Sequence, residues 1–407
     1  MSFKVALSGI NAASSDLDVI SNNLANLSTT GYKTSRAEFA SLVGSSQAVA
    51  SGTVQGRGAQ LSNVSRSFAQ GNTDTTGNSL DLAIEGSGFL VMSGGGATSY
   101  TRNGALLVDK SGFVVNSAGH RAQAFQPDSF GNITSNIGDL QISTADSAPQ
   151  ATATLTIGAN LDATETAISP SFSISDSTSY HSTASATIFD SLGVEHVFSS
   201  FFTKALPDGS GNWEVNGALD GVELPQTIPS RVINFDNAGG LTLPANGQFT
   251  YALTHGNGAA PQNLVIDLNQ FTQFGSPFSI NKLDQNGYTT GRLVDVTIGS
   301  DGVALARFSN GQTRAQGQVA MANFANPQGL AEGSFSSWVE TSDSGSPLIG
   351  APGTASLGLL QSGALESSNV DVTEMLVNLI TAQRNFQANA KTIETTDSLT
   401  QTIMNIR

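Results

Sequence analysis

The run FKVALSGINAASSDLDVISNNLANL, residues 3–27, places an apolar residue at every third or fourth position. This spacing lines the apolar side chains along one side of a helix, as in the seam of a coiled coil. The sequence therefore predicts an amphipathic helix that ends at Thr29-Thr30-Gly31, where Gly31 suits a left-handed cap. The predicted seam consists of Phe3, Ala6, Ile10, Ala13, Leu17, Ile20, Leu24 and Leu27.

The last part of the chain repeats this pattern with one polar interruption, Gln383. This glutamine either sets the register of the packing or is a tolerated polar residue. Two overlapping capping-box matches, beginning at Ser368 and at Asp371, offer alternative starts for a helix that is predicted to run nearly to Arg407. The second predicted seam consists of Val372, Leu376, Leu379, Gln383, Phe386, Ala390 and Ile393.

Two such seams predict that the ends of the chain meet each other and also meet other copies of the chain. Helices of about 25 and 35 residues would be about 37 and 52 Å long, which is more than a small β domain can cover. We therefore expect both ends to be poorly ordered in a free monomer and to fold upon assembly. The alternative is a helix hairpin within one chain that covers a sheet.

The middle of the chain predicts β structure with many tight turns. Apolar residues alternate from about Leu80 onward, and six Asn-Gly pairs occur, of which Asn103-Gly104 is predicted to form a hairpin turn. The predicted fold class is mainly β with helical termini that form a coiled coil, and an outer β domain inserted into an inner one. The predicted divisions are 1–30 and 369–407 for the helical assembly domain, 31–75 and 355–368 for an extended linker or arm, 76–146 and 286–354 for the inner β domain, and 147–285 for the inserted domain, a sandwich or flattened barrel.

The composition excludes several classes of function. A net charge of -15 with only 17 Lys and Arg residues leaves no basic patch for a nucleic acid or for an anionic membrane surface. The absence of cysteine excludes disulfides and Cys-ligated metals. No segment reaches the roughly 20 apolar residues that span a bilayer, and the first residues do not resemble a cleaved signal peptide.

No group of residues predicts a catalytic, cofactor or metal site. Glu195-His196 could be a metal or acid–base pair, but strand alternation would place the two side chains on opposite faces. The run Gly94-Gly95-Gly96 lacks the Lys-Ser or Lys-Thr of a phosphate loop. An extracellular enzyme or lectin built on the β middle would need a clustered polar or metal site, and the sequence indicates none.

Five motifs resemble the flagellar rod, hook and hook-associated protein family. The first motif spans residues 6–39 and includes Asn-Asn-Leu-Ala-Asn at Asn22 to Asn26 and Thr-Gly-Tyr-Lys at Thr30 to Lys33. The others are TGNSLDLAIEGSGFLVM (76–92), YTRNGALLVDKSGFVVN (100–116), QGQVAMANFANPQGL (316–330) and the stretch from SGALESSNV to the end (362–407). The inserted segment and the C-terminal ending are more similar to the hook members than to the shorter rod members, so a distal rod or hook–filament junction protein is the alternative.

The resemblance implies a structural subunit, not an enzyme, that uses no cofactor. In this family the terminal helices pair in the innermost layer of a tube and the β domains lie outside it. Hook members form a curved, flexible tube that acts as a universal joint and transmits torque from the rod to the filament. Asn22, Asn23 and Asn26 would be either solvated or hydrogen-bonded between copies.

The resemblance also implies a location and a set of partners. Subunits of the family are exported through the flagellar type III apparatus, without a cleaved signal, to the outside of the cell. The implied partners are further copies of the chain, the distal rod protein, the hook cap protein and the hook–filament junction protein. Neither a nucleic acid nor insertion into a membrane is expected.

Overall fold

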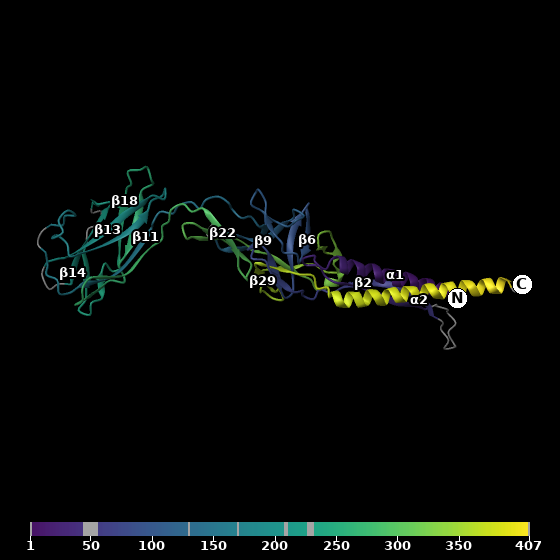
Figure 1. The fold of residues 1–407 in the computed structure, drawn as a ribbon. Coiled ribbons are helices and arrows are strands. Elements are labelled where there is room, and N and C mark those ends of the chain that lie inside the picture. Colours follow the sequence, from purple (N-terminus) through teal and green to yellow (C-terminus); the bar gives the residue numbers. More distant parts are fainter. Residues whose placement is uncertain are drawn as a thin grey trace. The chain divides into compact units, whose positions relative to one another are not determined.

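The computed structural model describes residues 2–43, 56–128, 131–168, 171–206, 211–225 and 232–405. The chain divides into two compact units, which Figure 1 shows as parts of one ribbon. Unit 1 comprises Met1–Thr144, Asp295–Arg307 and Thr313–Arg407, and unit 2 comprises Ala145–Val294 and Phe308–Gln312. Unit 2 thus includes the segment 147–285 that the sequence predicts as an insertion.

Two long helices from the two ends of the chain pack against each other in unit 1. The first helix, α1 (Ser2–Ala25), and the last, α2 (Val372–Asn405), run antiparallel, so that Gly9 of α1 lies against Asn389 of α2 (Figure 1). The Asp371 carboxylate accepts hydrogen bonds from the backbone N–H groups of Thr373 and Glu374, at 2.7 and 3.1 Å. Asp371 is therefore the N-cap, and the second of the two predicted helix starts is confirmed.

The predicted left-handed glycine does not end the first helix. Gly31 has a φ of +70°, but α1 already ends at Ala25 and is followed by turns. The N–H of Gly31 donates to the carbonyl of Glu366 at 2.8 Å, and a Cβ at this position would lie 2.6 Å from the backbone nitrogen of Asn103. Glycine is therefore required here for a close contact between distant segments, and the capping prediction is wrong.

The range 31–75, expected to be a linker or arm, contains two paired strands. Strands β1 (Ser35–Val43) and β2 (Gly56–Arg66) are antiparallel and lie along α1. The N–H of Ala59 in β2 donates to the Ser8 hydroxyl of α1 at 3.3 Å. The described part of the arm is therefore part of the helical section; residues 44–55 of the predicted linker lie outside the described residues.

The rest of unit 1 is a β region whose main sheet has the order β22-β23-β24-β9-β5-β6-β27-β26. Its core contains Phe89, Tyr100, Phe324 and Trp338, whose rings meet edge to face. The elements are β3 (Thr73–Thr75), β4 (Leu82–Glu85), β5 (Phe89–Gly94), β6 (Ala97–Thr101), β7 (Leu107–Val108), β8 (Val114–Val115), β9 (Arg121–Pro127), β10 (Ile133–Asp139), β22 (Leu293–Ile298), β23 (Val303–Phe308), β24 (Thr313–Val319), β25 (Met321–Asn323), a 3-10 turn (Pro327–Gly329), β26 (Ala331–Glu332), β27 (Ser337–Val339), β28 (Leu348–Gly350), β29 (Leu359–Ser362) and β30 (Ala364–Glu366).

Unit 2 consists of two sheets over one apolar core, with the orders β18-β19-β11-β20 and β12-β13-β14-β16-β17. Both sheets contribute to the core, for example through Leu155, Ile266, Phe202 and Trp213. The sandwich alternative therefore describes this unit. Its strands are β11 (Thr154–Asp162), β12 (Ser182–Phe189), β13 (Glu195–Lys204), β14 (Asn212–Leu219), β15 (Val222–Glu223), β16 (Val232–Phe235), β17 (Leu241–Leu243), β18 (Gln248–Leu253), β19 (Gln262–Asp267), β20 (Thr272–Phe274) and β21 (Ser279–Gln285).

The Asn-Gly pairs do not all form hairpin turns. Asn310-Gly311 does, because it joins the antiparallel strands β23 and β24 and Gly311 has a φ of +80°. The prediction for Asn103-Gly104 is wrong, since the preceding strand β6 pairs with β5 and β27 and not with the strand that follows. A Cβ on Gly104 would lie 1.8 Å from the carbonyl oxygen of Leu82, so this glycine permits a close backbone approach and not a turn.

Candidate assembly interface

The seam predicted on α1 faces the inside of the helical section, defined here as α1, α2, β1 and β2. Ala6, Ala13 and Ile20 are buried. Four more members of the predicted seam, Ile10, Leu17, Leu24 and Leu27, are partly buried, whereas Phe3 is 50% exposed. The small side chains of the two alanines allow α1 to approach its neighbours closely.

The seam predicted on α2 only partly coincides with the face that packs against α1. The buried residues of this helix are Met375 and Ala382, which the predicted seam leaves out. Predicted members Leu379, Ala390 and Ile393 are partly buried, and Leu379 packs against the cluster of Met375 and Ala382. The remaining predicted members, Val372, Leu376, Gln383 and Phe386, are exposed.

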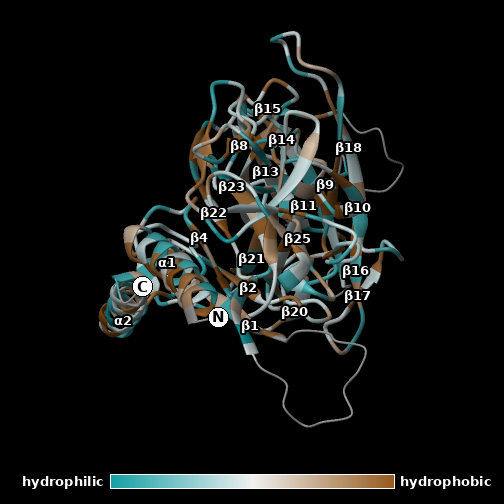
Figure 2. Cartoon of the chain, turned by 90° about the vertical axis from the view of Figure 1, so that its right-hand side faces the viewer, coloured by the Kyte–Doolittle hydropathy of each residue, from teal (hydrophilic) through white to brown (hydrophobic). Residues whose placement is uncertain are grey.

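α2 therefore has a second apolar face that α1 does not cover. Val372, Leu376, Val377 and Ile380 are 39–58% exposed, and hydrophobic colouring is visible on both terminal helices in Figure 2. An exposed apolar stripe beside a buried one is typical of a helix that contacts more than one partner. Gln383 lies on this exposed side, so it does not set the register of the α1–α2 packing.

The asparagines of the family-like motif form hydrogen bonds within the chain. Asn23 is 1% exposed; its amide donates to the carbonyl of Ser35 at 2.7 Å and accepts from the N–H of Ser35 at 2.9 Å. The hydroxyl of Tyr32 donates to the side-chain oxygens of Asn22 and Asn23, at 3.2 and 3.1 Å. For Asn23, both expected roles, solvated or bonded between copies, are wrong, because it fixes the start of β1 against α1.

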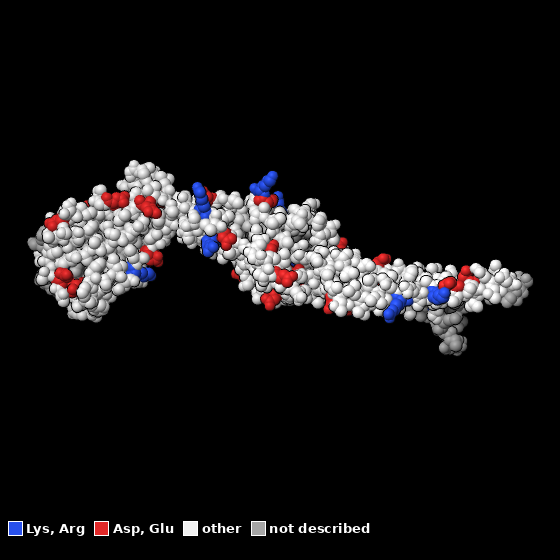
Figure 3. All heavy atoms as spheres, viewed as in Figure 1, with Lys and Arg blue, Asp and Glu red and all other residues white. Residues whose placement is uncertain are grey.

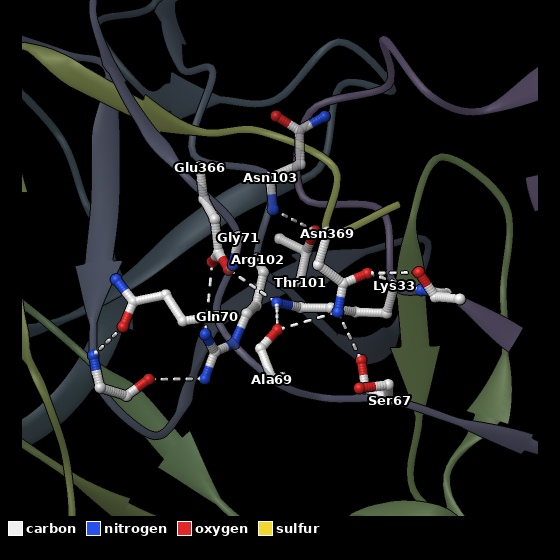
Figure 4. Close-up of polar contacts among 12 residues, drawn as sticks. Lys33, Ser67, Ala69, Gln70, Gly71, Thr101, Arg102, Asn103, Glu366 and Asn369 are labelled. Carbon is white, nitrogen blue, oxygen red and sulfur yellow. Dashed lines mark hydrogen bonds and ion pairs between the residues drawn. The ribbon is translucent and has the colours of Figure 1, made fainter. Parts of the chain in front are cut away.

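A buried ionic cluster joins the helical section to the β region of unit 1 (Figure 4). The Glu366 side chain is 0% exposed and accepts from the Lys33 ammonium at 2.6 Å, from the Gly71 N–H at 2.8 Å and from the Arg102 guanidinium at 3.3 Å. Glu366 lies at the end of β30, just before α2, and Lys33 lies between α1 and β1. Both helices therefore leave the β region at this cluster.

The cations of the cluster have further partners. Lys33 also donates to the carbonyl of Ala69 at 2.7 Å, and Arg102 donates to the carbonyl of Gly86 at 2.7 Å and lies over the ring of Phe89. Burial lowers the pKa of Lys33, and the hydrogen bond and charge of Glu366 act in the opposite direction. The carboxylate is thus what keeps a buried ammonium favourable at this position.

Asn369 connects the same segments a few residues later. Its side-chain oxygen accepts from the N–H and the hydroxyl of Thr34, both at 2.8 Å, and its amide donates to the carbonyls of Ser67 and Ala69, at 2.9 and 3.0 Å. The start of α2 is thus tied to both β1 and the end of β2. The sequence analysis quotes Thr-Gly-Tyr-Lys and Ala-Leu-Glu-Ser-Ser-Asn only as motifs; a cation and an anion inside otherwise uncharged motifs at the two helix bases are the signal that it missed.

A second polar cluster lies in unit 2 around His196 of β13. The imidazole is 2.6 Å from the Asp220 carboxylate and 3.4 Å from the Asp190 carboxylate, and its ring stacks near that of His255. Glu195 is exposed and makes no part of this cluster. Among the described residues no group of His, Asp and Glu has an arrangement suited to holding a metal ion.

The pKa values of this second cluster are shifted by its hydrogen bonds. Burial works to lower the pKa of His196, but the hydrogen bonds and charges of Asp220 and Asp190 raise it. Burial works to raise the pKa of Asp190, but hydrogen bonds from Asn257 and from backbone N–H groups lower it to about 2. The cluster is therefore most stable with a charged imidazole between two carboxylates.

The fold and its paired terminal helices define a structural axial subunit of the bacterial flagellum, and four family profiles agree with this class. They are flagella basal body rod protein (residues 3–33), flagellar hook protein FlgE/F/G D1 domain (83–171), flagellar basal body protein FlaE D2 domain (160–288) and flagellar basal body rod FlgEFG protein C-terminal (361–406). No helix within the described residues is long and apolar enough to cross a membrane.

Curated relatives match the chain from end to end. The flagellar hook protein FlgE of Escherichia coli K12 is 36% identical over 100% of both chains, and that of Salmonella typhimurium LT2 is 34% identical over the same share. FlgE of Treponema pallidum is 30% identical over 98% of both chains. The chain belongs to the flagellar hook protein FlgE family, whose members are structural subunits of the hook.

A solved structure shares the fold. The crystal structure of Helicobacter pylori flagellar hook protein FlgE2 aligns with a TM-score of 0.54 at 13% identity, covering 72% of this chain and 100% of that chain. The predicted fold class, mainly β with helical termini that pack together, is confirmed.

Replacing Glu366 with Gln should destabilise unit 1 by about 3–5 kcal/mol, because it leaves two buried cations without their anion. The matched control is Glu332→Gln, which breaks a surface pair with Arg66 and should cost less than about 1 kcal/mol. Urea unfolding followed by the fluorescence of Trp338, in a Trp213→Phe background, measures both. Equal losses in the two variants would contradict the role of the cluster.

Unit 2 should show a pH-dependent stability that His196→Gln removes in part. Because the folded pKa of His196 is raised above 6.5, its contribution is complete below pH 6.5 and is lost as the pH rises through the folded value. The Asp190 contribution is complete above its ordinary pKa of 3.8 and is lost as the pH falls toward about 2.

The measurement is the urea midpoint of the full chain from pH 2 to 9, followed by Trp213 fluorescence in a Trp338→Phe background. The decrease above pH 6.5 should flatten in His196→Gln, while the decrease at acidic pH remains. An unchanged alkaline slope would exclude His196 as its origin.

Proposed function

We propose that this chain polymerises through its terminal helices into the curved, flexible tube of the flagellar hook, which transmits torque from the rod to the filament. The observation that carries the proposal is the second apolar face of α2, which stays exposed after α1 has packed on the first. A monomer gains nothing from this exposed face, whereas a polymer buries it.

The assembly interface consists of the residues of the two predicted seams. Members that already pack between α1 and α2, such as Ile20 and Leu379, hold the helix pair together. Members that remain exposed, such as Phe3, Val372 and Leu376, face neighbouring copies. We also keep the proposal that the helices reach their full order only on assembly, because so much apolar surface is otherwise exposed to water.

The joint needs to be stiff in twist and soft in bending. Dense apolar packing of the helical sections and the buried cluster around Glu366 resist sliding, because breaking either is costly. The surface of both units carries few charges, and most of the face drawn in Figure 3 is neither acidic nor basic. Outer contacts made by neutral polar groups are weak and hydrated, so neighbouring copies can slide as the tube bends.

The proposal also covers location and partners. The chain would leave the cell through the flagellar type III export apparatus and act outside the cell. Its ends would meet the distal rod protein at one end of the tube and the hook cap and hook–filament junction proteins at the other. The proposed role is structural and includes no catalytic step. A distal rod or junction role is disfavoured, because the matches include the segment 160–288 as well as both ends.

Electron microscopy tests the proposal by comparing the full chain with a version trimmed to residues 32–368. Cells that lack their own copy of the gene should form hooks and swim when they receive the full chain. The trimmed chain should be secreted or soluble but form no tube, because it lacks α1 and α2. Full chain that is stably produced and exported without hooks would contradict the proposal.

Leu379→Asp should abolish hook formation, and Leu24→Asp should do the same. The new carboxylate would lie unpaired in the apolar contact between α1 and α2, at a cost of several kcal/mol. Leu379→Met, which keeps the apolar volume, is the matched control and should form normal hooks. Circular dichroism should show that the β content of each Asp variant is unchanged, and normal hooks from both Asp variants would disprove the seam assignment.

A further inference from the structure

The two ends of the helical section differ in charge. At its tip, which is the first turns of α1 with the start of β2, lie Lys4 and Arg57. Arg57 is adjacent to Gly58, whose backbone contacts Ser8 of α1, so both cations are at the same end. Both are exposed, and neither has an ion-pair partner within the described part of the chain.

The base of the helical section, where α1 ends and α2 begins, is acidic. Asp16 and Asp18 lie in the last turns of α1, and Asp371 and Glu374 lie at the start of α2. None of the four has an ion-pair partner among the described residues. Arg36 and Arg66, which also lie here, are already paired with Glu38 and Glu332.

Apolar surface is exposed beside each set of charges. At the tip Phe3, Val5 and Leu7 are 42–50% exposed, and at the base Val377 and Ile380 are 58 and 50% exposed. A hollow of about 670 Å³ at the base is lined by Glu38, Asp371, Glu374 and Met375 among others. Each end of the helical section therefore combines an apolar surface with charges of one sign, and the two signs are opposite.

We propose that the tip of the helical section of one copy docks on the base of the helical section of the next copy, with Lys4 facing Asp18. This inference rests on the proposed function, because it names the contact through which that polymer grows. The surfaces are complementary in charge and both are apolar. They are different surfaces of the same chain, so the contact is heterologous and extends without closing on itself, as a helical polymer requires.

The geometry of α1 sets the displacement between the two copies. Lys4 and Asp18 are separated by two heptads, so they lie on the same side of the helix, and both are exposed. Fourteen residues at 1.5 Å each correspond to about 21 Å along the axis. Parallel neighbours displaced by about 21 Å bring Lys4 of one copy to Asp18 of the next.

Disulfide trapping tests this contact without background, because the chain contains no cysteine. Lys4→Cys and Asp18→Cys variants are mixed, added to sheared wild-type tubes as seeds, allowed to elongate and then oxidised. Within one chain the two positions are about 21 Å apart, too far for a disulfide, which needs Cα atoms within about 7 Å. A cross-linked dimer of one Lys4→Cys chain with one Asp18→Cys chain is therefore the expected product.

The matched control pairs Lys4→Cys with Asn11→Cys, an exposed position on the same side of α1 that is one heptad nearer the tip. This pair should cross-link no more than a single-cysteine variant does. Polymer that forms without the 4–18 product, or in which 4–4 or 18–18 dimers dominate, overturns the inference and leaves the proposed function intact. Wild-type chain that does not elongate the seeds contradicts both.

Charge reversal provides a second readout. Lys4→Glu and Asp18→Lys should each slow elongation at low salt by about fivefold, and the effect should shrink as the salt concentration rises. The doubly reversed chain, Lys4→Glu with Asp18→Lys, should elongate at close to the wild-type rate. No recovery in the double variant would overturn the pairing of Lys4 with Asp18.

Discussion

The junction of the two terminal helices with the β region depends on one buried carboxylate. Glu366 has no exposed surface and holds Lys33, Gly71 and Arg102 through directional hydrogen bonds. Such bonds fix both distance and orientation, whereas apolar contacts fix mainly distance. A helix pair that moves relative to its β region cannot pass force to it, so a rigid junction precedes any mechanical role.

The helix pair is built in a different way from the junction. Alanines at positions 6, 13 and 382 are buried between α1 and its neighbours, and they let the backbones approach without fixing a single register. Larger apolar side chains, such as Val377 and Ile380, remain on the outside. The pair is thus tightly packed inside and still adhesive outside, which suits a subunit whose main stabilisation comes from other copies.

The sequence predicted α1 better than α2 for a physical reason. On α1 the 3–4 spacing has one solution, and its members Ala6, Ala13 and Ile20 are buried. On α2 two apolar faces overlap, so a seam through Leu376 and a seam through Met375 both fit the same period. Periodicity can show that a face is apolar, but not which face a given partner covers. The ionic cluster escaped prediction because Lys33 and Glu366 are 333 residues apart in sequence, and their meeting depends on the pairing of β3 with β30.

Sparse charge gives each ion an unusual influence on assembly. Charged residues make up 12% of the chain, so an apolar stripe with a heptad period meets little resistance to a shift by one heptad, about 10 Å. A shift of this kind preserves apolar contact but separates opposite charges that lie two heptads apart. Lys4 and Asp18 therefore distinguish one displacement from its neighbours at small energetic cost, while the apolar surfaces supply most of the affinity. The same division of roles lets neutral outer surfaces slide while the inner register stays fixed.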